Sequence, residues 1–168
     1  MSVLYATLGS SQNVTKLVMV DYTKDNYTFQ YPSSWRIDDS KTLGADVFAF
    51  SPLSDTLDSF SENVNLIIQE IGQQKITLAQ YKEISEKQII DMLSDGKILS
   101  SSIQKKGNEE YYTLTYSMSK DKYRIKMSAI CRIKRGKAYL FTFSAEADKY
   151  EEYKTIAEKI LDSFTVKQ

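Results

Sequence analysis

The sequence predicts an α+β fold in which α-helices pack on a largely antiparallel β-sheet. Three observations lead to this prediction. Several short segments alternate apolar and polar residues, as strands do. Two longer segments repeat apolar residues at helical spacing. Along the chain, strands are followed by a helix, then by hairpin-linked strands and a closing helix, which is typical of α+β proteins.

The amino-terminal part combines a weakly patterned stretch with three short strands. Residues 1–21 are polar apart from one apolar island, and we expect them to form an arm or tether before a single domain over residues 22–168. The strand in NYTFQYP should stop at Pro32, because proline has no N–H to donate to a ladder. A second strand is expected from Trp35, and a third, DVFAFSP, is expected to end at Pro52.

The middle of the chain holds a strand and a helix. The segment NVNLIIQEI is apolar on both parities at its centre, which favours a strand covered on both faces. The helix follows in ITLAQYKEISEKQIIDMLSDG, where Thr77 and Gln80 have the spacing of a capping box. Gly96 is expected to end this helix in a left-handed conformation.

Three strands and a helix complete the prediction. The strands are EEYYTLTYSM, KYRIKMSAICRIK and KAYLFTFSA, and Arg135 with Gly136 should form the tight turn between the last two. The closing helix lies in DKYEEYKTIAEKILDSF, where Asp148 and Glu151 are expected to cap the start. Its apolar face comprises Tyr150, Tyr153, Ile156, Ala157, Ile160 and Leu161.

Composition limits the classes of function. The 22 basic and 22 acidic side chains cancel, whereas a general nucleic-acid binder shows a basic excess, so we expect no nucleic-acid partner. The single cysteine, Cys131, excludes an internal disulfide and is expected to be a small buried hydrophobe. No apolar run approaches the roughly 20 residues that span a bilayer.

The residue types needed for common catalytic chemistry are missing. The chain has no histidine, which is the commonest general base near neutral pH. It contains no G-x-S-x-G motif, and its 6 glycines are scattered rather than gathered in a phosphate loop. We therefore expect a protein that is not an enzyme.

One acidic loop is a candidate metal site. SPLSDTLDSFSENVN places Asp55, Asp58 and Glu62 within a short stretch, and calcium binds carboxylate and carbonyl oxygens. The spacing does not match an EF-hand, and acidic loops are commonly just solvated. Calcium is the one cofactor considered; otherwise none is expected.

A cationic strand is the candidate partner-binding surface. In KYRIKMSAICRIK one parity is apolar, whereas the other carries Lys122, Arg124, Lys126, Arg132 and Lys134. Because burying several cations would cost their hydration, we expect this face to be exposed. It would then be either an ordinary solvated sheet face, with cations paired to Glu109, Glu110 or the acidic helix face, or a docking face for an acidic partner.

Two segments resemble the PsbP-like family, whose fold is shared by a Ran-binding nuclear import factor. FQYPSSW is similar to the family's strand-Pro-x-x-Trp opening. KAYLFTFSAEADKYEEYKTIAEKILDSF resembles its closing strand and helix, with matching positions at Tyr139, Phe143, Ala145, Tyr153, Ile160, Ser163 and Phe164. The resemblance covers about residues 22–166 and implies a PsbP-like α/β/α sandwich.

The resemblance also implies a range of functions. Plant members are thylakoid-lumen subunits of photosystem II that help to retain calcium and chloride, and bacterial relatives look like envelope lipoproteins, adaptors or chaperones. Photosynthetic members are associated with metal-binding histidines; this chain has none, which argues against those roles.

We therefore expect a non-enzymatic binding or adaptor domain that docks a protein partner at or near a membrane, with association through the amino-terminal arm. One alternative is a small-ligand or metal-binding module that uses a groove between the sheet and the carboxy-terminal helix. Another is a chaperone for apolar helical segments. The expected location is extracytoplasmic, in the cell envelope, with an export segment removed before Met1; the alternative is the cytoplasm.

Overall fold

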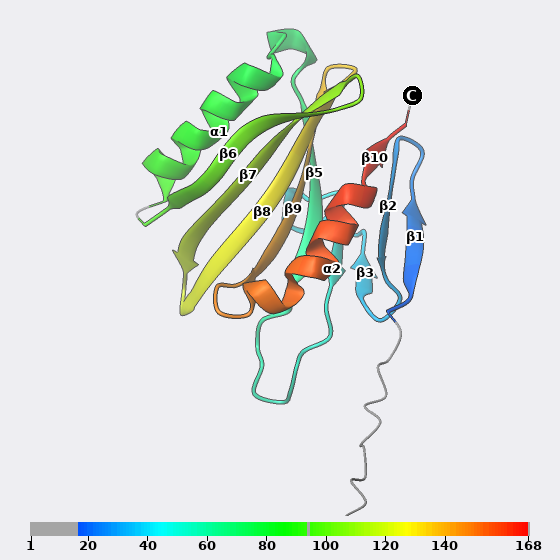
Figure 1. Ribbon diagram of the computed structural model, residues 1–168, viewed down its shortest axis with the longest axis vertical. Helices are drawn as coiled ribbons and strands as arrows, with labels where there is room; N and C mark the ends of the chain where they lie inside the picture. Colours follow the sequence, from blue (N-terminus) through cyan, green and yellow to red (C-terminus); the bar gives the residue numbers. More distant parts are fainter. Residues whose placement is uncertain (1–16, 94, 168) are drawn as a thin grey trace, which may run out of the picture.

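The computed structural model describes residues 17–93 and 95–167 and has the predicted α+β architecture (Figure 1). Its elements, in chain order, are β1 (Met19–Thr23), β2 (Tyr27–Pro32), β3 (Arg36–Asp38), the 3-10 turn η1 (Thr42–Gly44), β4 (Val47–Phe50), β5 (Asn63–Glu70), the 3-10 turn η2 (Gly72–Gln74), α1 (Leu78–Met92), β6 (Lys97–Lys106), β7 (Glu109–Lys120), β8 (Tyr123–Lys134), β9 (Lys137–Glu146), α2 (Tyr150–Ser163) and β10 (Thr165–Val166).

The strands form two antiparallel sheets. The main sheet has seven strands in the order β3-β4-β5-β9-β8-β7-β6, and the small sheet has the order β1-β2-β10. The turn between β8 and β9 is the predicted one, since Arg135 and Gly136 both have positive φ angles of 52° and 71°. Two adjacent positive φ angles suit the twist of a tight hairpin.

Each face of the main sheet is covered by a different helix. Alternate residues of β9 divide between two apolar clusters: Phe141 and Phe143 pack beneath α2 and the small sheet, whereas Ala138 and Leu140 belong to the cluster beneath α1. Figure 1 shows α1 alongside β6 and the small sheet beyond α2. The predicted sandwich of helices around a sheet is confirmed.

The strands and helices largely follow the predicted segments, but β1, β6 and β10 were not predicted. Strand β6 was not predicted, because KILSSSIQKK is serine-rich and mostly exposed and so lacks a clear apolar alternation. The capping box is confirmed: the Thr77 hydroxyl accepts from the Gln80 amide, and the Gln80 side chain accepts from the Thr77 amide.

Both predictions about the remaining helix ends are wrong. Helix α1 ends at Met92, and Gly96 does not have a positive φ. A side chain at Gly96 would place its Cβ 2.7 Å from the carbonyl oxygen of Ile89, so close packing rather than a left-handed turn requires glycine there. Lys149 is the N-cap residue of α2, and no side-chain cap is present; Glu151 lies in the first turn.

The predicted arm lies mostly outside the described residues, which begin at residue 17. Met19 to Asp21, assigned to the arm from the sequence, belong to β1 and pair with β2. In the part of the chain that the structure describes, no helix is long and apolar enough to cross a membrane.

Candidate functional site

Four of the five cationic residues lie on β8, which is extended as predicted, and Lys122 lies in the turn before it, but their face is not uniformly solvent-exposed. Ile130 shares their parity and packs in the core beneath α2. Arg132 is only 7% exposed. Its Nη1 donates to Glu109 Oε2 at 2.5 Å, and its guanidinium lies 5.0 Å from the centre of the Tyr111 ring.

Two further cations of this face are also engaged within the fold. Lys126 Nζ donates to Glu151 Oε1 at 3.0 Å and lies 3.9 Å from the centre of the Tyr150 ring. Lys134 donates to the carbonyl oxygen of Val166 at 3.0 Å. The intramolecular pairing of cations with Glu109 and with the acidic face of the closing helix is thus confirmed for Arg132 and Lys126.

The expectation that all five cations project into solvent is therefore wrong. Ile130 belongs to the apolar cluster beneath α2 and the small sheet, and Arg132 contacts Glu109 and Tyr111 of β7. Only Lys122 and Arg124 are classed as exposed among the five. Lys122 donates to the Ser59 hydroxyl at 3.2 Å. A partner-binding role for these residues stays a prediction.

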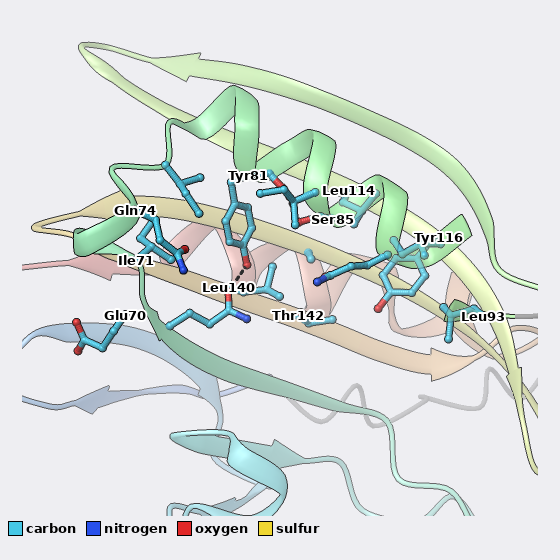
Figure 2. Close-up of a pocket in the computed structure, with 16 residues that line it drawn as sticks. Glu70, Ile71, Gln74, Tyr81, Ser85, Leu93, Leu114, Tyr116, Leu140 and Thr142 are labelled. Carbon is cyan, nitrogen blue, oxygen red and sulfur yellow. Dashed lines mark hydrogen bonds between the residues drawn. The ribbon is translucent and has the colours of Figure 1, made fainter. Parts of the chain in front are cut away.

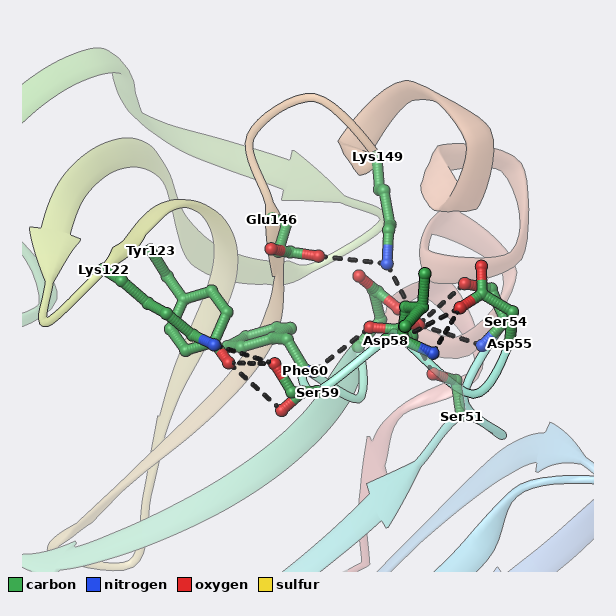
Figure 3. A network of polar contacts seen from close by, with 12 residues as sticks. Ser51, Ser54, Asp55, Asp58, Ser59, Phe60, Lys122, Tyr123, Glu146 and Lys149 are labelled. Atoms are coloured by element: carbon green, nitrogen blue, oxygen red, sulfur yellow. Dashed lines mark hydrogen bonds and ion pairs between the residues drawn. The ribbon is translucent and has the colours of Figure 1, made fainter.

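The acidic loop is organised by a lysine rather than by a convergent set of carboxylates (Figure 3). Lys149 lies 3.0 Å from Asp58 Oδ2 and 3.0 Å from Glu146 Oε2. Hydrogen bonds from the Ser54 amide and from Lys149 lower the pKa of Asp58. Asp55 accepts from the amides of Leu57 and Asp58 and so stabilises the turn.

Glu62 lies beneath this network and is fully buried. The Ser51 hydroxyl donates to its Oε2 at 3.4 Å, whereas Oε1 has no hydrogen-bond partner among the described residues. Burial raises the pKa of Glu62. Glu62 is therefore a buried titratable group at the end of the acidic loop.

The structure does not bring Asp55, Asp58 and Glu62 together as a metal site. Across the described residues, no group of three or more histidine, cysteine, aspartate or glutamate side chains could hold an ion. Asp55 stabilises a turn, Asp58 forms an ion pair with Lys149, and Glu62 is buried. Calcium binding by this loop stays a prediction.

A cavity lies between α1 and the sheet, a site that the sequence did not indicate (Figure 2). This α1 groove has a volume of about 540 Å³ and is lined by α1, the end of β5, η2 and strands β7 to β9. The pocket between the sheet and the carboxy-terminal helix, where a ligand was considered, has about 230 Å³. The groove forms because α1 packs against β6 and β7 while small residues such as Ala129 line the neighbouring floor.

The walls of the α1 groove are held by internal hydrogen bonds. The Tyr81 hydroxyl donates to Gln69 Oε1 at 2.7 Å, and the Ser85 hydroxyl donates to the Tyr81 carbonyl at 2.8 Å. Cys131 lies in the apolar cluster beneath α1 and is fully buried, and burial raises its pKa to about 12. The prediction that this cysteine is a buried hydrophobe is confirmed.

Strand β6 provides a second surface that the sequence did not reveal. It is a terminal strand of the main sheet and pairs only with β7 among the described strands. Leu99 and Ile103 on β6 are 46% and 40% exposed, and Ile90 on the adjacent helix α1 is 65% exposed. The β6 register shifts between Ile98 and Ser100, which marks a bulge.

The chain matches the sequence model of PsbP over residues 16–166. It belongs to the PsbP family. CyanoP from Synechocystis sp. (strain ATCC 27184 / PCC 6803 / Kazusa) is 27% identical over 158 residues, which cover 86% of this chain and 80% of CyanoP. The predicted resemblance to the PsbP-like family is confirmed.

Three solved structures share the fold of this chain. The solution structure of CyanoP from Synechocystis sp. PCC 6803 has a TM-score of 0.65 at 24% identity and covers 95% of this chain and 99% of that chain. LpqN, involved in cell envelope biogenesis of Mycobacterium tuberculosis, has a TM-score of 0.60 at 14% identity, with 91% of each chain covered. The Saccharomyces cerevisiae Ran-binding protein Mog1p has a TM-score of 0.60 at 9% identity, with 90% and 96% covered.

Proposed function

We propose that this PsbP-family domain is a non-enzymatic binding module that docks an extended acidic segment of a protein partner along the free edge of β6. The observation that carries the proposal is the combination of a ten-residue terminal strand with exposed apolar side chains on β6 and α1. A terminal strand presents unpaired backbone N–H and C=O groups, and an extended peptide can add to it as a further strand.

Charge favours an acidic partner at this edge. Lys97 begins β6, and Lys105 and Lys106 end it; all three are exposed. Within the described part of the chain they form no ion pair. A second copy of β6 added antiparallel would place lysines next to lysines, which is unfavourable. An acidic strand would instead meet opposite charge at both ends.

The similarity to a Ran-binding protein supports a protein partner in general terms. It does not identify the binding surface, since the two chains share 9% identity. The similarity to LpqN, which is involved in cell envelope biogenesis, supports a location in the cell envelope as part of the same proposal. Cell fractionation with an antibody to this chain tests that location.

Affinity capture from native extract tests the docking surface. The edge variant carries Leu99→Glu and Ile103→Glu, which place negative charge where the acidic segment would lie. The matched control carries Leu43→Glu and Leu57→Glu, at positions that are 85% and 92% exposed and lie outside β6 and α1. We expect quantitative mass spectrometry to show proteins that the wild type and the control capture and the edge variant loses.

A third variant tests the exposed end of the cationic strand. Lys122→Glu with Arg124→Glu reverses the two exposed cations at the start of β8 without breaking the buried Arg132 pair. Loss of captured proteins in this variant alone would assign docking to β8 and contradict the β6 proposal. Identical capture profiles for all variants would contradict both surfaces.

A further inference from the structure

We propose that the α1 groove binds a neutral, apolar small molecule that carries one hydrogen-bonding oxygen. This site is separate from the β6 edge and does not depend on it. Its volume of about 540 Å³ falls within the roughly 300–1,000 Å³ of typical ligand pockets. Figure 2 shows side chains from α1 and from the sheet facing one another across it.

The groove has an apolar interior. Its floor carries Leu114, Ala129 and Leu140 from three neighbouring strands. The α1 wall adds Ile89 and Leu93. Such an apolar surface favours an apolar ligand, because the free energy gained on binding scales with the apolar area that both surfaces remove from water.

The groove also lacks a charge that could pair with an ionic ligand. Among residues 17–93 and 95–167, no lysine or arginine lines it, and Glu70 is the one charged lining residue. The Glu70 carboxylate is 2.7 Å from Lys137 Nζ. An ion entering the groove would lose hydration without gaining a free counter-charge, which is costly. The ligand is therefore neutral.

Two hydroxyl groups on the lining offer hydrogen bonds to a ligand. Tyr116 and Thr142 both line the groove, and Figure 2 shows the Tyr116 side chain at the end of the groove near Leu93. Neither hydroxyl has a hydrogen-bond partner in residues 17–93 and 95–167, although Thr142 is only 7% exposed. Burial raises the pKa of Tyr116, so its hydroxyl stays protonated and can donate to a ligand oxygen.

The distribution of apolar residues favours a small molecule over a protein segment. Among the exposed large hydrophobic residues that the structure describes, only Ile84 lines the groove. The rest of the rim includes the amide side chains of Gln69, Gln74 and Gln88. A protein-docking surface would be expected to extend its apolar area beyond the cavity. Here the apolar area lies inside it.

Displacement of a neutral fluorescent dye tests the proposal on the full chain. The dye is N-phenyl-1-naphthylamine, and the competitors at pH 8 are decan-1-ol, decanoate and decylammonium, which share a chain length and differ in head-group charge. We expect dye binding, and half-displacement by decan-1-ol at a concentration at least about tenfold below that of either ion, because a buried ion lacks a partner.

Three variants locate the ligand. Tyr116→Phe removes the donor and should raise the half-displacement concentration of decan-1-ol about fivefold, the value of one neutral hydrogen bond, while dye affinity is unchanged. Tyr111→Phe, on the same strand but the opposite parity, is the matched control and should change neither. Gln88→Trp, at an exposed lining position of α1, should fill the groove and lower dye affinity at least tenfold.

The outcomes are distinct. The proposal would be overturned if decan-1-ol, decanoate and decylammonium displaced the dye equally well. It would also be overturned if Gln88→Trp left the dye affinity unchanged. Displacement of the dye by an apolar peptide but not by decan-1-ol would also overturn it and assign the groove to a protein segment. The edge variant Leu99→Glu/Ile103→Glu should bind the dye normally, so the failure of one proposal is separable from failure of the other.

Discussion

Reversing the charge at Arg132 should destabilise the domain strongly, although Arg132 belongs to the alternating cations that in the sequence look like an exposed strand face. The Arg132→Glu variant removes a charged hydrogen bond worth about 1.5–3 kcal/mol. It also places a carboxylate at a position that is 7% exposed and faces Glu109. Breaking a buried pair in this way costs about 3–5 kcal/mol, so we expect a loss of at least about 3 kcal/mol in the free energy of unfolding.

Two companion variants separate burial from pairing. Arg132→Met keeps an apolar chain of similar length and removes Nε, which has no hydrogen-bond partner among the described residues. Because the Glu109 side chain is 48% exposed and can be hydrated when alone, we expect a cost of only about 1 kcal/mol. Arg124→Glu, an exposed position of the same parity, should stay within about 0.5 kcal/mol of wild type.

Urea denaturation monitored by circular dichroism measures all three differences. For a domain of this size, a loss of 3 kcal/mol corresponds to a fall in Tm of roughly 6–12 °C. The reasoning would be refuted if Arg132→Glu cost no more than Arg124→Glu, because that result would mean that the Arg132 side chain is solvated as the sequence pattern suggests.

Three further predictions concern a buried acid, a turn and a helix cap. Because burial raises the folded-state pKa of Glu62, its destabilising effect is absent below the unfolded pKa, grows as the pH rises from the unfolded to the folded pKa, and is constant above it. The stability of Glu62→Gln relative to wild type should therefore increase between pH 4 and pH 8, to a difference of about 1 kcal/mol at pH 8 in chemical denaturation. Gly136→Ala should lower the free energy of unfolding by about 2–3 kcal/mol, because φ is 71° and the new Cβ would lie 2.9 Å from the backbone of η2. Gly107→Ala, where φ is 62° and no atom lies near the new Cβ, should lower it by about 1 kcal/mol. Thr77→Ala should cost about 1 kcal/mol through loss of the capping box, measured by the urea midpoint.

Each of these has a clear contradicting result. A pH-independent difference between Glu62→Gln and wild type would mean that the carboxylate is solvated. Equal costs for Gly136→Ala and Gly107→Ala would mean that the close approach to η2 does not limit the turn. An unchanged midpoint for Thr77→Ala, with Thr165→Ala as a control on an exposed residue outside the helix, would mean that α1 does not depend on its cap.

Local features of the fold could be read directly from the sequence. The capping box at Thr77 and the turn at Arg135 and Gly136 depend on neighbouring residues only, and both are confirmed. The alternation in β8 also correctly predicted an extended strand. Strand β6 was missed because an edge strand buries little apolar surface, so it need not show the apolar alternation of an internal strand.

The candidate sites could be predicted only in part. Alternation separates two faces of a strand but does not state what covers each face. The cations of β8 were therefore assigned to solvent, whereas Ile130 lies in the core beneath α2 and Arg132 is buried in a pair with Glu109. The α1 groove could not be anticipated, because it depends on where α1 rests across the sheet and on which small residues lie beside it.

The sequence by itself determined the α+β class, the main periodic segments, two local turn and cap structures, and the resemblance to the PsbP family. These depend on spacing along the chain, which hydrogen bonding and side-chain direction translate directly into local structure. Only the tertiary structure decided which cations are buried in pairs, that the acidic loop is held by Lys149, and that a cavity lies beside α1. These depend on contacts between residues far apart in the chain, and burial at such contacts sets the free-energy cost of each charge.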